Sequence, residues 1–363
     1  YIEIGEDVDA PYIEEIKKHR IDPETLASCA GDLKIVYTPL HGTGNKLVRR
    51  VLAECGFTQV HVVPEQELPD GDFPTVPYPN PEDVRALELA RQLGEKIDAD
   101  LIVGTDPDAD RMGIMVKTPE GYKPFTGNMT GMLLTHYILD ARKKTGTLPA
   151  DGFVVKSIVT TEMVRPMTEE YGVELRDVLT GFKYIGQQIL RSEQSGKGTF
   201  LFGFEESYGY LCGTYARDKD AVSASLLICE MAAICKAQGV SLIDHLEALY
   251  KKYGYYKEAV VSMAFEGIEG AAKMKEIMAQ MRENPKESYA GLKVIAVEDY
   301  LKGFKDYPKS DALRIRLENN CWVCVRPSGT EPKIKFYFGA NGKTAEEAEI
   351  LTQALKEEMT AGI

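Results

Sequence analysis

The first part of the chain alternates short apolar runs with segments of helical periodicity. Apolar runs typical of buried strands occupy Leu33–Tyr37, Gln59–Val63 and Asp100–Gly104. A helical stripe before the third run is formed by Val84, Leu87, Ala90, Leu93 and Ile97. Asn80, followed by Pro81, predicts the point at which that helix begins. Strands and helices in alternation predict a mostly parallel, doubly wound sheet.

The same alternation returns in the middle of the chain and then stops. Strands are predicted at Phe153–Val159, Val173–Val178 and Thr199–Gly203. The segment Lys219–Gln238 is apolar nearly all round, which predicts a buried helix. After Tyr256, one helix near Ala271–Arg282 precedes a run of strands, and a last helix starts at Thr344. The strands of this last part are predicted at Leu292–Val297, Ala312–Leu317, Cys321–Arg326 and Lys333–Phe338.

We therefore predict an α/β protein with two doubly wound mixed α/β domains, followed by a smaller antiparallel α+β domain at the C-terminus. A length of 363 residues fits two or three domains. The predicted divisions are a linker or remnant helix at 1–20, and domains at 21–147, 148–255 and 256–363. Because the chain starts at Tyr1 rather than Met, we expect it to be a piece of a larger protein.

Charge and cysteine content restrict the partners and the compartment. The formal net charge is −13, which argues against a nucleic-acid partner because phosphate backbones would be repelled. No run approaches the roughly 18 apolar residues of a membrane span, so we expect no membrane association. Seven scattered cysteines indicate free thiols in a reducing cytoplasm. An anionic ligand would need local basic clusters to hold it against the negative mean charge.

The strongest chemical signal directly follows the third predicted strand. Asp106, Asp108 and Asp110 alternate in a short loop that ends at Arg111. Three carboxylates so close together need a cation, and hard oxygen ligands favour Mg²⁺. An EF-hand is excluded because Arg111 stands where its glycine is required. A solvated acidic turn and a phosphatase with an aspartyl nucleophile are the alternatives for this loop.

A second signal joins the last two predicted strands and is basic. Arg326 and Lys335 flank a turn that contains Ser328, Gly329 and Thr330. Hydroxyls and open backbone N–H groups suit phosphate oxygens, and Arg326 can bind a phosphate with two hydrogen bonds. An ordinary hairpin turn with basic flanks is the alternative.

Three weaker signals also stand at element ends. Gly203–Gly209 contains Glu205, Glu206 and Ser207, which suit hydrogen bonds to sugar hydroxyls. Gly181 and Lys183 follow another predicted strand, and Lys219 lies in a charged turn before the apolar helix. Solvated polar turns are the alternative in each case. His41 lies in a glycine-containing loop and is interpreted as a residue that hydrogen-bonds that loop.

Taken together, these loops resemble the α-D-phosphohexomutase family, in the same order along the chain. The resemblance is carried by Asp106–Arg111, Gly181–Lys183, Phe204–Gly209 and Arg326–Thr330, and it extends from about Leu33 onward. The Phe-Glu-Glu-Ser form of the third loop is most similar to that of phosphoglucomutases. The resemblance implies the second, third and fourth of the four domains of that family, and a sugar phosphate as substrate.

The resemblance also implies a role for each loop. Asp106, Asp108 and Asp110 match the Mg²⁺ ligands, Arg111 matches a residue beside the transferred phosphoryl group, and Lys219 matches a lysine with a general acid/base role. The residues that match sugar-binding positions are Gly181, Lys183, Glu205 and Ser207. Those that match the site of the phosphate that is not transferred are Arg326, Ser328, Gly329, Thr330 and Lys335.

One departure from the family is large. The family's nucleophile is a serine in a Ser-His-Asn-Pro type loop of the first domain, and here no serine is followed by histidine. We therefore expect a missing N-terminal domain of the same protein as partner, and no mutase activity from this chain alone. The competing hypotheses are a phosphomannomutase or phosphopentomutase, a sugar-phosphate-binding module without chemistry, and the aspartyl phosphatase.

Overall fold

The structure is a computed structural model of the chain, and it describes all residues except 1, 3, 266, 329–331 and 362–363. It divides into two compact units, which are described separately. The first unit comprises Tyr1–Ser157 and Val164–Ala248, and the second comprises Ile158–Met163 and Leu249–Ile363. The short segment Ile158–Met163, which follows a strand of the first unit, is thus part of the second.

The first sheet of the first unit is five-stranded and mixed, with the order β2-β1-β3-β4-β5. Its strands are β1 (Lys34–Thr38), β2 (Gln59–Val62), β3 (Leu101–Thr105), β4 (Met112–Thr118) and β5 (Gly121–Phe125). β1 pairs in parallel with β2 and β3, whereas β3, β4 and β5 pair antiparallel. The expected mixed, doubly wound sheet is confirmed, with β4 as its one reversed strand, although the hairpin β4–β5 was not predicted.

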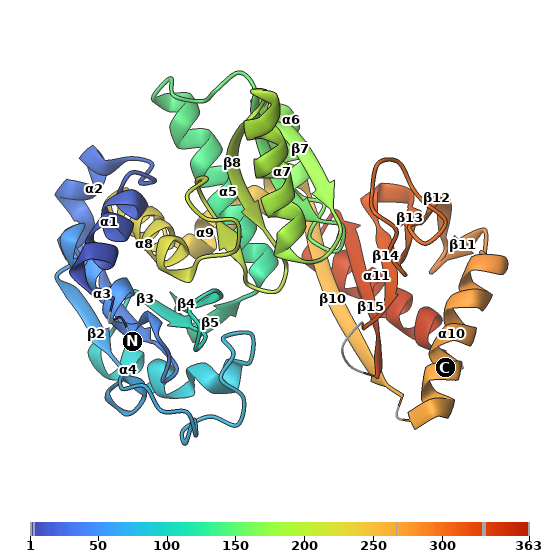
Figure 1. Cartoon of the computed structure of the whole chain (residues 1–363), viewed down its shortest axis with the longest axis horizontal. Helices are drawn as coiled ribbons and strands as arrows, with labels where there is room; N and C mark the ends of the chain where they lie inside the picture. Colours follow the sequence, from blue (N-terminus) through green and yellow to red (C-terminus); the bar gives the residue numbers. More distant parts are fainter. Residues whose placement is uncertain (1, 3, 266, 329–331, 362–363) are drawn as a thin grey trace. The chain divides into compact units, whose positions relative to one another are not determined.

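Helices surround this sheet (Figure 1). They are α1 (Glu6–Lys17), α2 (Pro23–Cys29), α3 (Gly44–Glu54) and α4 (Glu88–Ile97), with 3₁₀ turns η1 (Ala30–Asp32), η2 (Pro64–Gln66) and η3 (Val84–Leu87). Helix α5 (Gly127–Lys144) follows β5 and packs mainly against the second sheet of this unit and its helices. The predicted start of α4 at Asn80 is wrong. The Asn80 side chain accepts the amide of Glu82, and Asp83 caps only η3. Such short polar side chains compete with helical hydrogen bonds and keep the backbone in turns.

The second sheet of the first unit is four-stranded, with the order β7-β6-β8-β9. Its strands are β6 (Gly152–Ser157), β7 (Glu174–Val178), β8 (Thr199–Phe204) and β9 (Tyr210–Leu211). β6 pairs in parallel with β7 and β8, and β9 is antiparallel to β8. The helices of this part are α6 (Val164–Tyr171), α7 (Phe182–Ser195), α8 (Ala221–Ala237) and α9 (Leu242–Tyr253).

Helix α8 connects the two sheets of the first unit. Every residue from Ala221 to Cys235 is buried, which confirms the prediction of a buried helix. α8 packs against α2, α3 and β3 on the side of the first sheet and against α5 and β9 on the side of the second. Its N-terminus therefore lies where loops from both sheets meet.

The second unit is built on an antiparallel six-stranded sheet of order β10-β15-β14-β13-β12-β11. Its elements are β10 (Tyr255–Ala264), α10 (Gly267–Glu283), β11 (Ser288–Tyr289), β12 (Leu292–Asp299), β13 (Leu313–Leu317), η4 (Glu318–Asn320), β14 (Trp322–Pro327), β15 (Lys333–Gly342) and α11 (Ala345–Thr360). The α/β class with an antiparallel last part is confirmed. β10 was not predicted, because its side chains vary between exposed and half-buried and only Tyr256 among them is buried.

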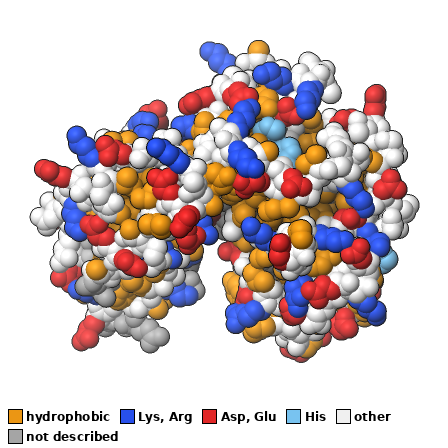
Figure 2. All heavy atoms as spheres, turned by 180° about the vertical axis from the view of Figure 1, so that it is seen from behind, with side chains coloured by type: hydrophobic (Ala, Val, Ile, Leu, Met, Phe, Trp, Pro, Cys, Tyr) orange, Lys and Arg blue, Asp and Glu red, His pale blue; other side chains and the backbone are white. Residues whose placement is uncertain are grey.

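Three further properties concern hydrophobic helices, cysteines and surface charge. In the part of the chain that the structure describes, no single helix is long and apolar enough to cross a membrane. Helices α8 and α9 together have the required length and composition, but they are bent by 91° at the break between them. All seven cysteines are buried and free of disulfides. On the face shown in Figure 2, acidic and basic side chains are interspersed.

Candidate functional site

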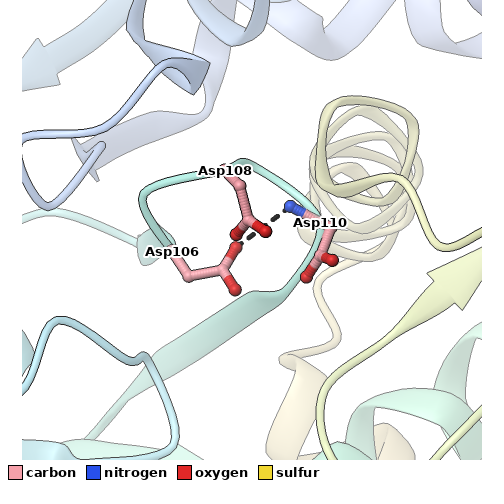
Figure 3. Close-up of side chains that lie close together, drawn as sticks. All are labelled: Asp106, Asp108 and Asp110. Atoms are coloured by element: carbon pink, nitrogen blue, oxygen red, sulfur yellow. Dashed lines mark hydrogen bonds between the residues drawn. The ribbon is translucent and has the colours of Figure 1, made fainter. Parts of the chain in front are cut away.

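The loop between β3 and β4 brings three carboxylates together (Figure 3). One oxygen from each of Asp106, Asp108 and Asp110 lies within 4.8 Å of the others. Asp106 Oδ1 accepts hydrogen bonds from the amides of Asp110, at 3.0 Å, and Arg111, at 2.8 Å. The backbone of the loop therefore folds around the Asp106 carboxylate. This fold brings the side chains of Asp108 and Asp110 close to that of Asp106.

The electrostatics of this loop favour a cation. Asp106 is only 7% exposed. Burial is the main cause that raises its pKa to about 7, and the charges of Asp110 and Asp108 add to the effect. A divalent cation would offset both causes, since it attracts the ionised form and takes three oxygen ligands at once. The donor set therefore fits Mg²⁺, a hard ion that prefers carboxylate oxygens.

Two cationic side chains reach the same carboxylates. Lys219 Nζ lies 2.5 Å from Asp110 Oδ2. Burial lowers the pKa of Lys219, but its bonds to Asp110 and Asp218 outweigh burial and raise it. Arg111 Nε lies 3.7 Å from Asp106 Oδ2 and 3.8 Å from Asp110 Oδ1. The positive charges thus stand at the edge of the carboxylate cluster, where an anionic ligand would meet them.

Backbone contacts from two directions hold the loop in place. The amide of Thr43, at the start of α3, donates to Pro107 O at 2.8 Å. The approach at that point is close enough that a Cβ on Gly42 would lie 2.4 Å from Pro107 Cα. On the other side, the amide of Ala221 donates to Ala109 O at 3.0 Å. The loop is therefore clamped between the β1–α3 connection and the N-terminus of α8.

The Gly203–Gly209 loop joins the carboxylate loop and the Gly181 turn. Gly209 forms an isolated antiparallel bridge with Arg111. Glu205 Oε1 accepts the amide of Gly181 at 2.6 Å, and Gly181 has φ +117°, a conformation that suits glycine. Burial, and then the charge of Glu206, raise the pKa of Glu205 to about 7. Within the first unit, three of the predicted loops are thus linked by direct bonds.

The remaining predicted residues of this unit are more exposed. Ser207 is half-buried, and Lys183 is exposed at the start of α7. Lys183 Nζ lies 5.1 Å from the centre of the Tyr184 ring. Both residues belong to loops that Glu205 ties together, but they are not part of the carboxylate cluster.

The basic loop lies in the second unit. Arg326 on β14 and Lys335 on β15 are directly opposite partners in the antiparallel pair. Such neighbours have Cβ atoms about 5 Å apart, so two positive charges stand side by side. The amide of Ser328 donates to Lys333 O at 2.7 Å, which closes one end of the turn. Gly329 and Thr330, which were also predicted here, lie outside the described residues.

One residue of the site, Glu82, was not predicted from the sequence. Glu82 forms an ion pair with Arg111, with Oε1 2.7 Å from Nη1. No local pattern marks a contact between residues 29 positions apart. Asp220 belongs to the charged turn that the sequence places before the apolar helix, and its side chain caps α8. His41 bonds Thr75 Oγ1 at 2.8 Å through Nε2, in agreement with its predicted role in the loop.

Comparisons with protein families give consistent matches along the chain. Residues 10–121 match the model described as phosphoglucomutase/phosphomannomutase, alpha/beta/alpha domain II. Residues 126–253 match domain III of the same family, and residues 262–357 match its C-terminal domain. The three matches follow one another in family order.

Full sequences of relatives agree with these matches. The phosphoglucomutase of Staphylococcus epidermidis is 40% identical over 320 residues, which cover 84% of this chain and 57% of that protein. The phosphoglucomutase of Staphylococcus saprophyticus is 36% identical over 330 residues, covering 88% of this chain and 59% of the relative. The chain thus spans less than two thirds of the length of these relatives.

Solved structures agree on the fold. The exocytosis-sensitive phosphoprotein pp63/parafusin of Paramecium, a phosphoglucomutase, has a TM-score of 0.71 at 18% identity. The match covers 97% of this chain and 61% of the Paramecium chain. An Aspergillus fumigatus N-acetylphosphoglucosamine mutase, solved with GlcNAc-6P and magnesium, has a TM-score of 0.54 at 13% identity. That match covers 98% of this chain and 66% of the Aspergillus chain. The chain belongs to the phosphoglucomutase/phosphomannomutase family and corresponds to its domains II to IV.

Proposed function

We propose that this chain carries the metal, sugar and phosphate sites of a phosphohexomutase that interconverts glucose 1-phosphate and glucose 6-phosphate. The observation that carries the proposal is the cluster of three carboxylates beside Lys219 and Arg111, bonded to the Gly203–Gly209 loop. The 40% identity to a phosphoglucomutase supports the choice of glucose phosphates. Buried free cysteines support a reducing compartment, the cytoplasm.

Asp106, Asp108 and Asp110 would hold Mg²⁺. The ion would supply positive charge to the oxygens of the phosphoryl group in transfer. Arg111, which already lies within 4 Å of two of these carboxylates, would bind the same phosphoryl group from the side. Lys219 would move a proton at the reacting sugar hydroxyl, since its ammonium group stands beside Asp110.

The sugar and the second phosphate would be held by the other loops. Glu205 and Ser207 would bind sugar hydroxyls, with Gly181 and Lys183 alongside them. The phosphate that is not transferred would bind the basic loop of the second unit, through Arg326, Ser328, Gly329, Thr330 and Lys335. The opposed cations Arg326 and Lys335 support that assignment, because two adjacent positive charges attract an anionic phosphate.

The reaction would run as two phosphoryl transfers. A phosphoserine would give its phosphoryl group to the free hydroxyl of the sugar phosphate: the bond from phosphorus to the serine oxygen breaks as the bond to the sugar oxygen forms, and the hydroxyl's proton ends on the serine oxygen. The bisphosphorylated sugar would turn over, and the serine hydroxyl would accept the phosphoryl group from the other position, with its proton passing to the sugar oxygen that is left. Because no serine of this chain is followed by histidine, the nucleophile would come from outside these 363 residues.

The test measures binding of glucose 1-phosphate by calorimetry with and without Mg²⁺. We expect binding that strengthens with Mg²⁺ and loses this dependence in Asp108→Asn. Asp72→Asn is the matched control, since Asp72 is an exposed loop aspartate that is not part of the carboxylate cluster. Binding that ignores Mg²⁺, or that responds equally to both substitutions, would contradict the proposal.

A further inference from the structure

Two tyrosine hydroxyls converge on one carboxylate at the start of α8. Tyr12 OH, on α1, donates to Asp220 Oδ2 at 2.8 Å, and Tyr215 OH donates to the same oxygen at 2.6 Å. The other oxygen, Oδ1, accepts the amides of Val222 at 2.7 Å and Ser223 at 3.2 Å. Asp220 is only 7% exposed, so four donors surround one buried carboxylate.

The tyrosines form a small aromatic group with His19. The rings of Tyr12 and Tyr215 lie 6.3 Å apart at 66°, and His19 stacks on Tyr215 at 5.2 Å. Burial, and then the negative charge of Asp220, raise the pKa of both tyrosines. Their hydroxyls therefore keep their protons and remain donors to the carboxylate.

The residues on either side of Asp220 contact the carboxylate loop. Lys219 Nζ lies 2.5 Å from Asp110 Oδ2, and the amide of Ala221 donates to Ala109 O at 3.0 Å. The amide of Asp220 itself donates to Tyr210 O at 2.9 Å, in the second sheet. A movement of the Asp220 side chain would therefore shift both contacts at once, because they flank it in the chain.

We propose that Tyr12 and Tyr215 are positioning residues for the metal loop. They act through Asp220: their hydroxyls orient its carboxylate, the carboxylate fixes the first turn of α8, and that turn holds Asp110 and Ala109 in place. The proposal rests on the proposed function in one respect, namely that this loop binds a divalent cation. It also gives α1, which was interpreted as a linker, a part in the site.

A matched pair of variants separates positioning from general stabilisation of α8. Tyr137 OH donates to Glu230 Oε1 at 2.9 Å, so it makes the same kind of buried bond to the same helix. Glu230 lies ten positions after Asp220, in the middle of α8 and away from its first turn. Tyr137→Phe should lower stability as Tyr12→Phe does, but it should leave the metal loop undisturbed.

The probe is Mn²⁺, which takes the same oxygen ligands as Mg²⁺ and can be titrated by electron paramagnetic resonance. We expect Tyr12→Phe with Tyr215→Phe to weaken Mn²⁺ binding about tenfold, as loss of outer-shell partners does. Tyr137→Phe should stay within about twofold of the unchanged chain. If the double variant does not fold by circular dichroism, Tyr12→Phe alone should still weaken binding measurably.

Three outcomes would overturn the proposal. Unchanged Mn²⁺ affinity in folded Tyr12→Phe and in the folded double variant would show that the tyrosines do not position the loop. An equal loss in Tyr137→Phe would show that only the stability of α8 matters. Failure of the unchanged chain to bind Mn²⁺ would remove the metal site itself and the proposed function with it.

Discussion

The clearest consequence of the carboxylate cluster is that Mg²⁺ binding should depend on pH near neutrality. Burial raises the pKa of Asp106 from 3.8 to about 7, so in the metal-free protein this side chain carries a proton below pH 7. A metal ion needs the ionised form and must displace that proton. The affinity should therefore fall as the pH is lowered through 7, and it should level off above about pH 8.

The size of the effect follows from the fraction of ionised Asp106. With a pKa of about 7, about one tenth of the molecules are ionised at pH 6 and about nine tenths at pH 8. The apparent Kd for Mg²⁺ should then be about tenfold weaker at pH 6 than at pH 8, and binding at pH 6 should release about one proton. An ordinary exposed aspartate would give no change over this range.

Calorimetry in two buffers of different ionisation enthalpy measures both the affinity and the released proton. Glu205 is the necessary control, because burial also raises its pKa to about 7. Glu205→Gln should keep the pH dependence, whereas Asp106→Asn should bind more weakly and release no proton. A Mg²⁺ affinity that does not change between pH 6 and 8 would refute the reasoning. So would a pH dependence of that affinity that disappears in Glu205→Gln.

Three further predictions concern stability and loop packing. Burial raises the pKa of Glu230 from 4.5 to about 7, so the native state holds the carboxyl proton more tightly than the unfolded state does. The free energy of unfolding should therefore fall by about 3 kcal/mol as the pH rises from 4.5 to 7. Glu230→Gln should remove that fall, which urea unfolding at pH 5 and pH 8 would measure. Gly42→Ala should force the backbone away from Pro107, cost about 1–3 kcal/mol and weaken Mg²⁺ binding, whereas Gly71→Ala, with nothing within 4 Å, should do neither. Arg314→Met should lower the stability of the second unit by about 3–5 kcal/mol, because it removes the cation that lies 2.6 Å from the buried Glu162 and 3.8 Å from the buried Glu298, and a thermal unfolding midpoint like that of the unchanged chain would count against this.

Local sequence patterns were sufficient to predict a helix or strand where that element is strongly periodic or strongly apolar. The strand Leu101–Thr105 and the buried helix Ala221–Ala237 were recognised within a few residues. In each case the burial of the segment matches its composition, so hydrophobicity alone carries the information. The antiparallel last part was recognised for the same reason.

Elements that depend on distant partners were missed. The strand Tyr255–Ala264 has a single buried side chain, that of Tyr256, and it is a strand because Lys333–Gly342 offers ten partners for its backbone. The helix predicted from Asn80 begins only at Glu88, because Asn80 and Asp83 bond nearby amides first. Tertiary and side-chain hydrogen bonds of this kind override the secondary-structure propensity of the local sequence.

The candidate site shows the same division. Asp106, Asp108 and Asp110 alternate within five residues, and this spacing alone identifies them as one cluster. The bond from Tyr12 to Asp220 joins residues 208 positions apart, and no spacing rule predicts it. What positions the loop therefore depends on tertiary contacts, while its chemistry can be read locally.

The central claim is that the chain holds the Mg²⁺ and sugar-phosphate sites of a mutase but not its nucleophile. It is tested most directly by following glucose 1-phosphate by ³¹P nuclear magnetic resonance with the purified chain and Mg²⁺. The predicted result is a resonance that shifts on binding, with no glucose 6-phosphate formed. Conversion to glucose 6-phosphate, or a resonance that does not respond to the chain, would contradict the claim.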